Sequence, residues 1–392
     1  MIEGSKTGSL AMRLQYGMVG GGEGAFIGDV HRKAVNFDQK AVLVAGSFSR
    51  SFDNTLATGK SLGLDRGRLY KSYTEMAEAE AKRKDCIDFV VIVTPNSTHY
   101  EIAKAFLEHG IHVVCDKPLV FTTAQAQELA ALAKKRKLLF GVTYTYTGYP
   151  AVKQARALIA SGEIGDLRYV NVEYAQEWLA TPAEKSGNKQ AAWRTDPKLT
   201  GIANSVGDIG THAENMVSYM TGLKIDSLCA RLDTFVKGRK LDDNATILVN
   251  YRGGARGVMW VSQIAIGNDN SLRIRVYGSK GSIEWAQESP NYLRVSNLEG
   301  PSRLVSRGRD AFVPSAQAFS RIPAGHPEGY FEAFANVYRS FCESLIRLKN
   351  GEKLTAEQMD FPNVMDGAQG VRFIEKCVAS SKEGAAWVKF DE

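Results

Sequence analysis

Residues 14–28 read LQYGMVGGGEGAFIG, an apolar run that leads into a glycine-rich loop and then into a helical pattern. A strand, a glycine loop and a helix in this order form the context in which dinucleotides are bound. Gly20 would allow the tight turn after the strand, and Gly22 would let the backbone approach a pyrophosphate. Gly24 and Gly28 would allow the helix to pack closely on the strand. We therefore expect a phosphate-binding loop here.

The helix after this loop would supply positive charge for the anion. Its first residues are Ala25, Phe26 and Ile27. The N–H groups at this end have no partners inside the helix, and the helix dipole is positive here. The spacing is not a strict G-x-G-x-x-G, because Ala25 occupies the place of the third glycine. A flexible glycine turn without a ligand is the alternative interpretation.

The first 150 residues alternate short apolar runs with helical patterns, at the spacing of right-handed βαβ units. The apolar runs are rich in Val and Ile on both faces, which indicates a parallel sheet covered on both sides. We therefore predict an α/β, NAD(P)-binding Rossmann domain over residues 1–150. The predicted strands are 14–20, 41–48, 88–94, 112–115 and 138–143, and the predicted helices are 25–37, 54–64, 73–83, 98–109 and 122–135.

The remaining residues, 151–392, show longer alternating runs that are typical of half-buried antiparallel strands. We predict an α+β domain with an open, mostly antiparallel, meander-like sheet, which binds substrate and forms the oligomer. Residues 301–327 have little periodicity and predict a long surface excursion. The predicted strands are 168–174, 225–235, 245–251, 256–264, 272–277 and 281–285, and the predicted helices are 151–161, 206–221, 329–349 and 364–381.

Charge, hydropathy and cysteine spacing exclude several classes of protein. The 49 basic and 43 acidic residues include no run of five basic residues, so we expect no nucleic-acid partner. No apolar segment reaches the ~18 residues of a membrane span, and Met1–Met12 lacks the apolar core of a signal peptide. The five cysteines include no Cys-x-x-Cys pair, which favours a cytoplasmic location. No cluster has the spacing of metal ligands, so we expect a metal-free reaction.

The tip of the second predicted strand bears on the choice between NAD and NADP. It contains Ser47, Ser49 and Arg50, and the first acid after it is Asp53. An acid would hold the 2′-hydroxyl of NAD, whereas hydroxyls and an arginine suit the 2′-phosphate of NADP. A helix N-cap followed by a solvated arginine explains the same residues equally well. We expect NAD or NADP, with NADP slightly favoured.

Three further motifs follow the glycine loop along the chain. Residues 94–99 read TPNSTH, residues 115–118 read CDKP, and residues 193–197 and 207–212 read WRTDP and GDIGTH. Together with the loop, they resemble the motifs of the Gfo/Idh/MocA family of sugar and polyol oxidoreductases, namely TPN-x-x-H, E-K-P and G-x-x-x-D-x-G-x-H. The chain departs from the second motif in having Asp116 in place of Glu. The match spans nearly the whole chain, and the joint occurrence is much more specific than any one motif.

The resemblance implies a fold, a reaction and an assembly. The reaction is hydride transfer between a nicotinamide cofactor and a secondary hydroxyl of a cyclic sugar, sugar derivative or polyol. The assembly is a homodimer or homotetramer through the outer face of the C-terminal sheet, where Val258, Trp260 and Ser262 would lie. The implied cofactor contacts beyond the glycine loop and the second strand are Thr94, Pro95, Asn96, His99, Asp116, Lys117, Trp193 and Arg194.

Lys117 makes chemical sense without the resemblance. It follows a predicted parallel strand, at the edge of the sheet where open α/β folds bind ligands. Its ammonium can donate to a hydroxyl oxygen that becomes a carbonyl, and Asp116 could orient it. A lysine lying along the surface is the alternative, which the Asp-Lys-Pro context disfavours.

Asp208 and His212 are four residues apart in a predicted helix, so both lie on one face. Imidazole suits proton transfer at neutral pH, and Asp208 would orient the ring or bind a second substrate hydroxyl. We predict Lys117, Asp208 and His212 as the catalytic residues. A capping Asp with an unrelated surface His is the alternative, which Trp193-Arg194 upstream and the family match disfavour.

Other side chains are weaker candidates. Tyr146 follows the last strand of the first domain, where aromatic side chains would contact a sugar or pack the two domains together. Arg194 could hold an anionic group of the substrate or the cofactor, and His326 could close over the cleft. We expect Asn96 and His99 to shape the cleft rather than to react. The predicted substrate contacts are Lys117, Tyr146, Arg194, Asp208, His212 and His326.

Two rival functions stay open. One is an enzyme that keeps its cofactor bound and transfers a hydride from one sugar to another. The other is a regulator that binds a dinucleotide and a sugar without turnover, although the presence of both Lys117 and His212 argues against it.

Overall fold

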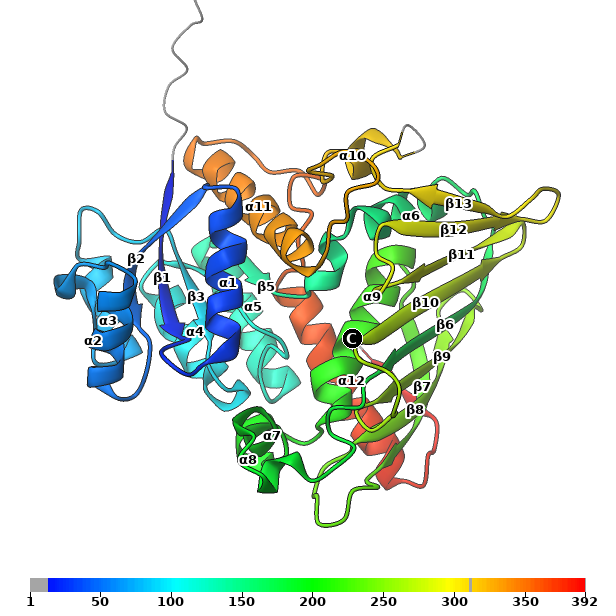
Figure 1. Ribbon diagram of the computed structural model, residues 1–392, viewed down its shortest axis with the longest axis horizontal. Helices are drawn as coiled ribbons and strands as arrows, with labels where there is room; N and C mark the ends of the chain where they lie inside the picture. The colour runs from blue at the N-terminus through cyan, green and yellow to red at the C-terminus, as the bar shows by residue number, and fades with distance from the viewer. Residues whose placement is uncertain (1–12, 310–311, 392) are drawn as a thin grey trace, which may run out of the picture.

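The computed structural model describes residues 13–309 and 312–391, in which two sheets face one another across a layer of helices (Figure 1). Met1–Met12, on which the expectation of no signal peptide rests, lies outside this range. None of the helices in the described residues is both long enough and apolar enough to cross a membrane.

The smaller sheet is the predicted parallel one. Its five strands have the order β2-β1-β3-β4-β5, and all neighbouring pairs are parallel. Helix α1 packs on one face, and α3, α4 and α5 pack on the other. The strands are β1 (Leu14–Gly20), β2 (Ala41–Ser47), β3 (Phe89–Val93), β4 (His112–Cys115) and β5 (Phe140–Val142), and the helices are α1 (Phe26–Phe37), α2 (Phe52–Ser61), α3 (Tyr73–Ala81), α4 (His99–Glu108) and α5 (Thr123–Arg136).

The larger sheet has nine strands in the order β13-β12-β11-β10-β6-β9-β8-β7-β14. It is mostly antiparallel, as predicted, but it is not a simple meander. Strand β6 lies between β10 and β9 and pairs with β9 in parallel. The strands are β6 (Leu167–Ala175), β7 (Ile225–Asp233), β8 (Asn244–Tyr251), β9 (Arg256–Ser262), β10 (Ser271–Gly278), β11 (Gly281–Ala286), β12 (Tyr292–Asn297), β13 (Arg303–Ser306) and β14 (Val388–Lys389).

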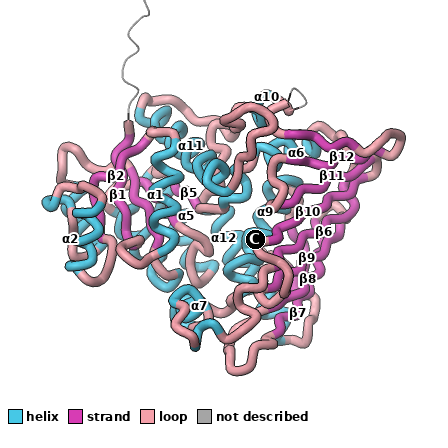
Figure 2. The backbone as a smooth tube through the Cα atoms, in the orientation of Figure 1, coloured by secondary structure: helices cyan, strands magenta, loops and turns pink. Residues whose placement is uncertain are grey.

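In the described part of the chain, helices cover only the inner face of the larger sheet. Figure 2 shows them between the two sheets, while the outer side carries strands alone. Alternation explains this, because the inward side chains of the strands are buried and many outward ones are not. The helices of this half are α6 (Pro150–Ala160), α7 (Lys189–Arg194), α8 (Pro197–Thr200), α9 (Thr211–Thr221), α10 (Pro314–Gln317), α11 (Tyr330–Lys349) and α12 (Val364–Lys382).

Helix α11 returns to the first sheet. Its apolar side chains Phe334, Phe341 and Leu345 share a core with Tyr16 and Val91 of the parallel strands. The sequence places this helix within 151–392, whereas its packing places it on the same face of the parallel sheet as α1. One face of the parallel sheet is therefore covered partly by a helix from the C-terminal part of the sequence.

Residues 301–309 and 312–327, expected to form a surface excursion, contain regular structure. They include β13 and α10, and Arg307 between these two elements is buried. The Arg307 guanidinium donates to the Ile322 carbonyl at 2.7 Å and forms an ion pair with the buried Glu328 at 2.7 Å. A single buried cation thus holds together a segment without hydrophobic periodicity.

Candidate active site

A cleft of about 560 Å³ lies at the carboxyl ends of the parallel strands, between the two sheets. This is the edge at which open α/β sheets bind ligands. The cleft is lined by residues of both halves: Gly24, Ala25, Phe26, Ile27, Val93, Thr94, Pro95, Asn96, Asp116, Lys117, Thr143, Thr145, Tyr146, Tyr174, Gln176, Lys189, Gln190, Trp193, Arg194, Asp208, Ile209, His212, Asn270, Tyr330 and Phe334.

The glycine loop has the backbone that a phosphate site requires. Gly20 and Gly24 have φ of +86° and +84°, which favours glycine. A Cβ on Gly28 would overlap the backbone of Gly21, so α1 approaches the loop as closely as predicted, although through Gly28 and not Gly24. The N-cap residue Ala25 makes no side-chain bond to the first turn, which leaves its N–H groups to an anion. These residues therefore fit a dinucleotide pyrophosphate.

The residues predicted around the ribose lie at the end of β2, away from the walls of the cleft. Ser47 is buried, and the Ser49 hydroxyl accepts from the Ser51 N–H at 3.2 Å. Ser51 in turn caps α2 by accepting from the Asn54 N–H. Arg50 is exposed between them and extends into solvent at the strand tip.

The TPN and DKP segments are joined by His99, which is fully buried. One ring nitrogen lies 2.8 Å from the Thr94 carbonyl, and the other lies 3.1 Å from the Pro118 carbonyl. Asn96 donates to the Thr200 carbonyl at 3.2 Å and so connects the cleft to the second half. Both side chains are engaged with backbone, which agrees with a role in shaping the cleft.

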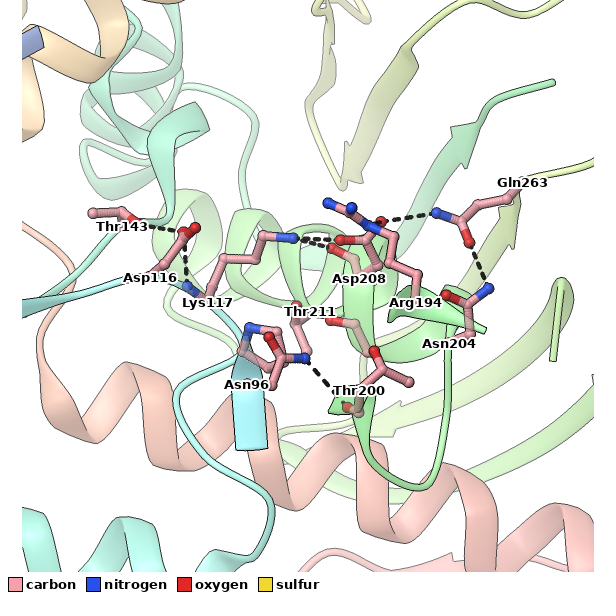
Figure 3. Close-up of polar contacts among 12 residues, drawn as sticks. Asn96, Asp116, Lys117, Thr143, Arg194, Thr200, Asn204, Asp208, Thr211 and Gln263 are labelled. Atoms are coloured by element: carbon pink, nitrogen blue, oxygen red, sulfur yellow. Dashed lines mark hydrogen bonds and ion pairs between the residues drawn. The ribbon is translucent and has the colours of Figure 1, made fainter. Parts of the chain in front are cut away.

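Asp116 orients the backbone of Lys117 and not its ammonium. Its Oδ1 accepts from the Lys117 N–H at 2.9 Å and from the Thr143 hydroxyl at 2.7 Å (Figure 3). Asp116 was expected to orient Lys117, and it does so through the main-chain N–H and not through the amine.

The amine of Lys117 is bound by Asp208, 91 residues further along the chain. Its Nζ donates to Oδ1 of Asp208 at 2.8 Å and to the main-chain carbonyl of the same residue at 2.7 Å (Figure 3). These bonds occupy two of the three ammonium protons. Lys117 lines the cleft, and the third proton has no partner among the residues that the structure describes.

Asp208 also binds a second cation. Its Oδ2 accepts from Nε of Arg194 at 3.0 Å, and the Arg194 guanidinium lies over the Trp193 ring at 4.2 Å. Burial alone would raise the pKa of Asp208, but Arg194 and Lys117 outweigh it and hold that pKa far below its ordinary value. Asp208 is therefore an anion that fixes two cations at the wall of the cleft.

His212 is positioned by aromatic rings and not by Asp208. A π-helical turn, Val206–Gly210, precedes α9, so the predicted single helix changes pitch between the two residues. The His212 ring lies edge-on to the rings of Tyr146 and Tyr144, with 4.8 Å and 5.6 Å between the ring centroids. Its buried Nδ1 has no hydrogen-bond partner in the described part of the chain. Burial, and then Lys117, lower the pKa of His212 well below 6.5, so the imidazole is neutral at pH 7.

A polar network forms another wall of the cleft. The hydroxyls of Tyr146 and Tyr174 hydrogen-bond to each other. Tyr174 and Gln176 both donate to Oδ1 of Asn270 at 2.7 Å. Sequence reasoning found Tyr146 but missed the others, because they stand at strand ends or between strands, where no local pattern separates them from other polar residues.

His326 does not line the cleft. It is exposed in a separate depression beside Arg307, and its carbonyl accepts from that guanidinium at 2.5 Å. The buried Arg307 holds this segment away from Lys117 and His212. Tyr330, four residues later, lines the cleft instead, as the first residue of α11. The structure thus places His326 outside the cleft that it was expected to close over.

Comparison with known families decides the membership of this chain. An oxidoreductase family with an NAD-binding Rossmann fold matches residues 14–144, and the GFO/IDH/MocA C-terminal domain matches residues 152–284. The chain belongs to the Gfo/Idh/MocA family. It is an oxidoreductase whose residues 14–144 match the NAD-binding Rossmann domain of that family. The resemblance in its motifs is thereby confirmed.

Individual members of the Gfo/Idh/MocA family match over the full length. The uncharacterized oxidoreductase YfiI of Bacillus subtilis (strain 168) is 38% identical over 393 residues, with 100% of both chains covered. A solved inositol dehydrogenase homolog from Azotobacter vinelandii, complexed with NAD+, is 39% identical with a TM-score of 0.93 and covers 99% of this chain and 100% of that one. An inositol dehydrogenase homolog from the same organism, complexed with NADH and myo-inositol, is 38% identical with a TM-score of 0.90, at 97% and 98% coverage.

Proposed function

We propose that this protein oxidises a secondary hydroxyl of a cyclic sugar, sugar derivative or polyol, reversibly, with NAD or NADP as hydride acceptor. The observation that carries the proposal is the pairing of Lys117 and His212 in one cleft. Lys117 is an ammonium with one free proton, and His212 is a neutral base. In the oxidation, one stabilises the charge on the substrate oxygen and the other accepts its proton.

Each residue has a separate task in the oxidation. Lys117 donates a hydrogen bond to the substrate oxygen and stabilises the negative charge that develops there. His212 accepts the hydroxyl proton, because its low pKa leaves it unprotonated at neutral pH. Asp208 holds the Lys117 amine in place through the ion pair at 2.8 Å. Gly24, the start of α1 and the TPN segment line the cleft and would hold the dinucleotide, whose nicotinamide would supply the hydride acceptor.

The polar wall supports a polyhydroxylated substrate. Tyr146, Tyr174, Gln176 and Asn270 offer both donors and acceptors at the side of the cleft away from the glycine loop. A sugar or polyol ring carries alternating hydroxyls that pair with such groups, whereas an apolar alcohol would leave them unsatisfied. The relative that is complexed with NADH and myo-inositol supports the same substrate class for this chain.

Turnover of a substrate panel tests the proposal. The purified protein is mixed with NAD or NADP and single polyols or cyclic sugars, and NAD(P)H is followed at 340 nm. We expect turnover with single substrates and free cofactor. Conversion of two sugars only when both are present, detected by product analysis because no net NAD(P)H accumulates, would support the enzyme that keeps its cofactor. Cofactor binding without any turnover would support the regulator.

The Lys117→Ala variant tests the role of Lys117 as the donor to the substrate oxygen. Loss of the oxyanion donor should lower kcat by about 10²-fold or more, since removing one such donor costs that much in other enzymes. Affinity for NAD, measured by calorimetry, should change little, because the phosphate loop lies elsewhere in the cleft. Near-normal turnover in this variant would exclude the role of Lys117.

We also propose that the outer face of the nine-stranded sheet joins subunits into a dimer or tetramer. Leu248 faces Val258 across β8 and β9, and Tyr169 faces Tyr277 across β6 and β10. Leu248, Tyr169 and Tyr277 are 44%, 40% and 41% exposed, which is high for large apolar or aromatic side chains on neighbouring strands. Ser262, also expected on this face, is the last residue of β9 and is buried.

A further inference from the structure

Gln263 is a fully buried amide that no motif points to, and it lies directly behind the predicted catalytic residues. It follows β9, and its Nε2 donates to Oδ2 of Asp208 at 2.9 Å (Figure 3). Asp208 thus receives three donors: Lys117 on one oxygen, and Arg194 and Gln263 on the other. Of these, only Gln263 is neutral and outside the walls of the cleft.

Asn204 determines which end of the Gln263 amide faces Asp208. Its Nδ2 donates to Oε1 of Gln263 at 2.9 Å and to the main-chain carbonyl of Asp242 at 3.2 Å. A carbonyl oxygen can only accept, so Asn204 must direct its NH₂ group toward it. The Oε1 of Gln263 then accepts from Asn204, and the Nε2 group must face Asp208.

The hydrogen bonds from Asn204 through Gln263 to Asp208 begin at Asp242, which also binds the turn that carries Asp208. The carboxylate of Asp242 accepts from the N–H of Asn204 at 2.7 Å and from that of Val206 at 2.9 Å, and the Ser205 hydroxyl donates to it as well. These residues lead into the π-helical turn Val206–Gly210. Main chain and side chain of Asp208 are therefore positioned by the same buried loop.

The amide oxygen of Asn204 is buried without a partner in the described residues. Leaving a polar atom unsatisfied costs stability. Turning the Asn204 amide over would place that oxygen against the carbonyl of Asp242 and against Oε1 of Gln263, which is worse. The surrounding acceptors therefore set the direction of these hydrogen bonds, from Asn204 to Gln263 and from Gln263 to Asp208.

We propose that Asn204 and Gln263 are positioning residues for the reaction, since they orient the Asp208 carboxylate and through it the ammonium of Lys117. This inference rests on the proposed function. Without the Gln263 donor, Asp208 is free to rotate toward its two cations, and Lys117 no longer presents its third proton at a fixed point. The effect should fall on kcat rather than on cofactor binding.

Gln263→Leu tests the donor directly. We expect kcat with the best polyol to fall about tenfold or more, as for loss of a hydrogen bond to a charged group, while the Kd for NAD changes little. Gln154→Leu is the matched control, because Gln154 is equally buried and accepts from the Val313 N–H at 2.8 Å, away from the cleft. Gln154→Leu should cost stability without the selective loss of kcat. Wild-type kcat in Gln263→Leu would overturn the proposal.

Gln263→Glu adds a readout that a purely structural role would not change. The introduced carboxyl would face Asp208, with Arg194 and Lys117 beyond it and Asp242 and Asp243 behind it. While protonated, it can donate to Asp208 as the amide does; once ionised, it repels Asp208. The ratio of variant to wild-type kcat should therefore fall as pH rises. A ratio that is independent of pH would contradict the proposal.

Crystal structures separate this inference from the proposed function. In Asn204→Asp, the Gln263 amide should turn over and present Oε1 to Asp208, so the Asp208 carboxylate and Nζ of Lys117 should move. In Gln263→Leu the same two groups should move without any change at the glycine loop. These observations require no turnover, so they stand even if no sugar is oxidised. Unmoved Asp208 and Lys117 in both variants would overturn the proposal.

Discussion

His212 has aromatic rings on several sides and lines the same cleft as the Lys117 cation. Both features disfavour a second positive charge, which is why its pKa lies well below 6.5. Asp208 is near enough to oppose this effect but does not reverse it. His212 is therefore the neutral base of the cleft, and Lys117 is its hydrogen-bond donor.

The pH dependence of oxidation follows from the state of His212. Its conjugate acid cannot accept the hydroxyl proton, so kcat/KM should fall on the acidic side, with a midpoint below 6.5. In His212→Asn, kcat should drop by about 10² to 10⁴-fold and the acidic limb should disappear. Steady-state rates between pH 4.5 and 9 measure both. A variant that retains the wild-type limb would show that another group is the base.

Arg50 bears on the choice between the two dinucleotides. It is exposed at the tip of β2, beyond the capping hydroxyl of Ser51. If its guanidinium binds the 2′-phosphate, Arg50→Ala should weaken NADP binding by about tenfold or more and leave NAD binding unchanged, as for loss of a charge-assisted bond. Calorimetric titration with each dinucleotide measures the ratio. Equal effects on the two cofactors would show that Arg50 is only solvated.

At the scale of elements, α9 and α12 enclose a carboxyl group that the reaction does not use. Glu214 is 2% exposed, and one of its oxygens accepts from the Gln369 amide. The other oxygen has no partner in the residues that the structure describes. Burial, with Asp366 nearby, raises the pKa of Glu214 to about 7. The helix pair is therefore built to hold a protonated carboxyl.

Glu214 should make stability depend on pH. Its pKa is raised on folding, so its contribution is complete below its unfolded pKa near 4.5 and is lost as pH rises through 7. Glu214→Gln should therefore be more stable than wild type at pH 8, by up to about 3 kcal/mol, and the difference should become small toward pH 5. Urea unfolding at the two pH values measures it. A difference of equal size at both would indicate a packing effect instead.

At the scale of the whole molecule, the uncovered face of the nine-stranded sheet gives the clearest prediction. Leu248→Arg should leave the fold intact, because the side chain is exposed, and should dissociate the oligomer by burying a charge in the proposed interface. Sedimentation velocity measures the mass. The control is Leu62→Arg, since Leu62 is 37% exposed on the first domain. An unchanged mass in Leu248→Arg would place the interface elsewhere.

The sequence alone was sufficient for the features that depend on local order. The glycine loop, the five parallel strands and most of the helices follow from periodicity over a few residues, and the structure has them within a few residues of the predicted bounds. The chemical types in the cleft, Lys117 and His212, were also identifiable, because each stands in a short motif. Strand β12 and the short helices near the cleft were missed, since their patterns are too brief to separate from loops.

Only the tertiary structure decided which distant groups meet. The partner of Lys117 lies 91 residues away, and that of Asp208 on its buried side lies 55 residues away at Gln263. The insertion of β6 beside β9, the return of α11 to the parallel sheet and the exclusion of His326 from the cleft are of the same kind. Hydrophobic periodicity specifies which face of an element is buried but not which other element covers it. Which elements pack together depends on the complementarity of their whole surfaces. In this protein that packing brings Asp208 to Lys117 and Arg194 in the cleft.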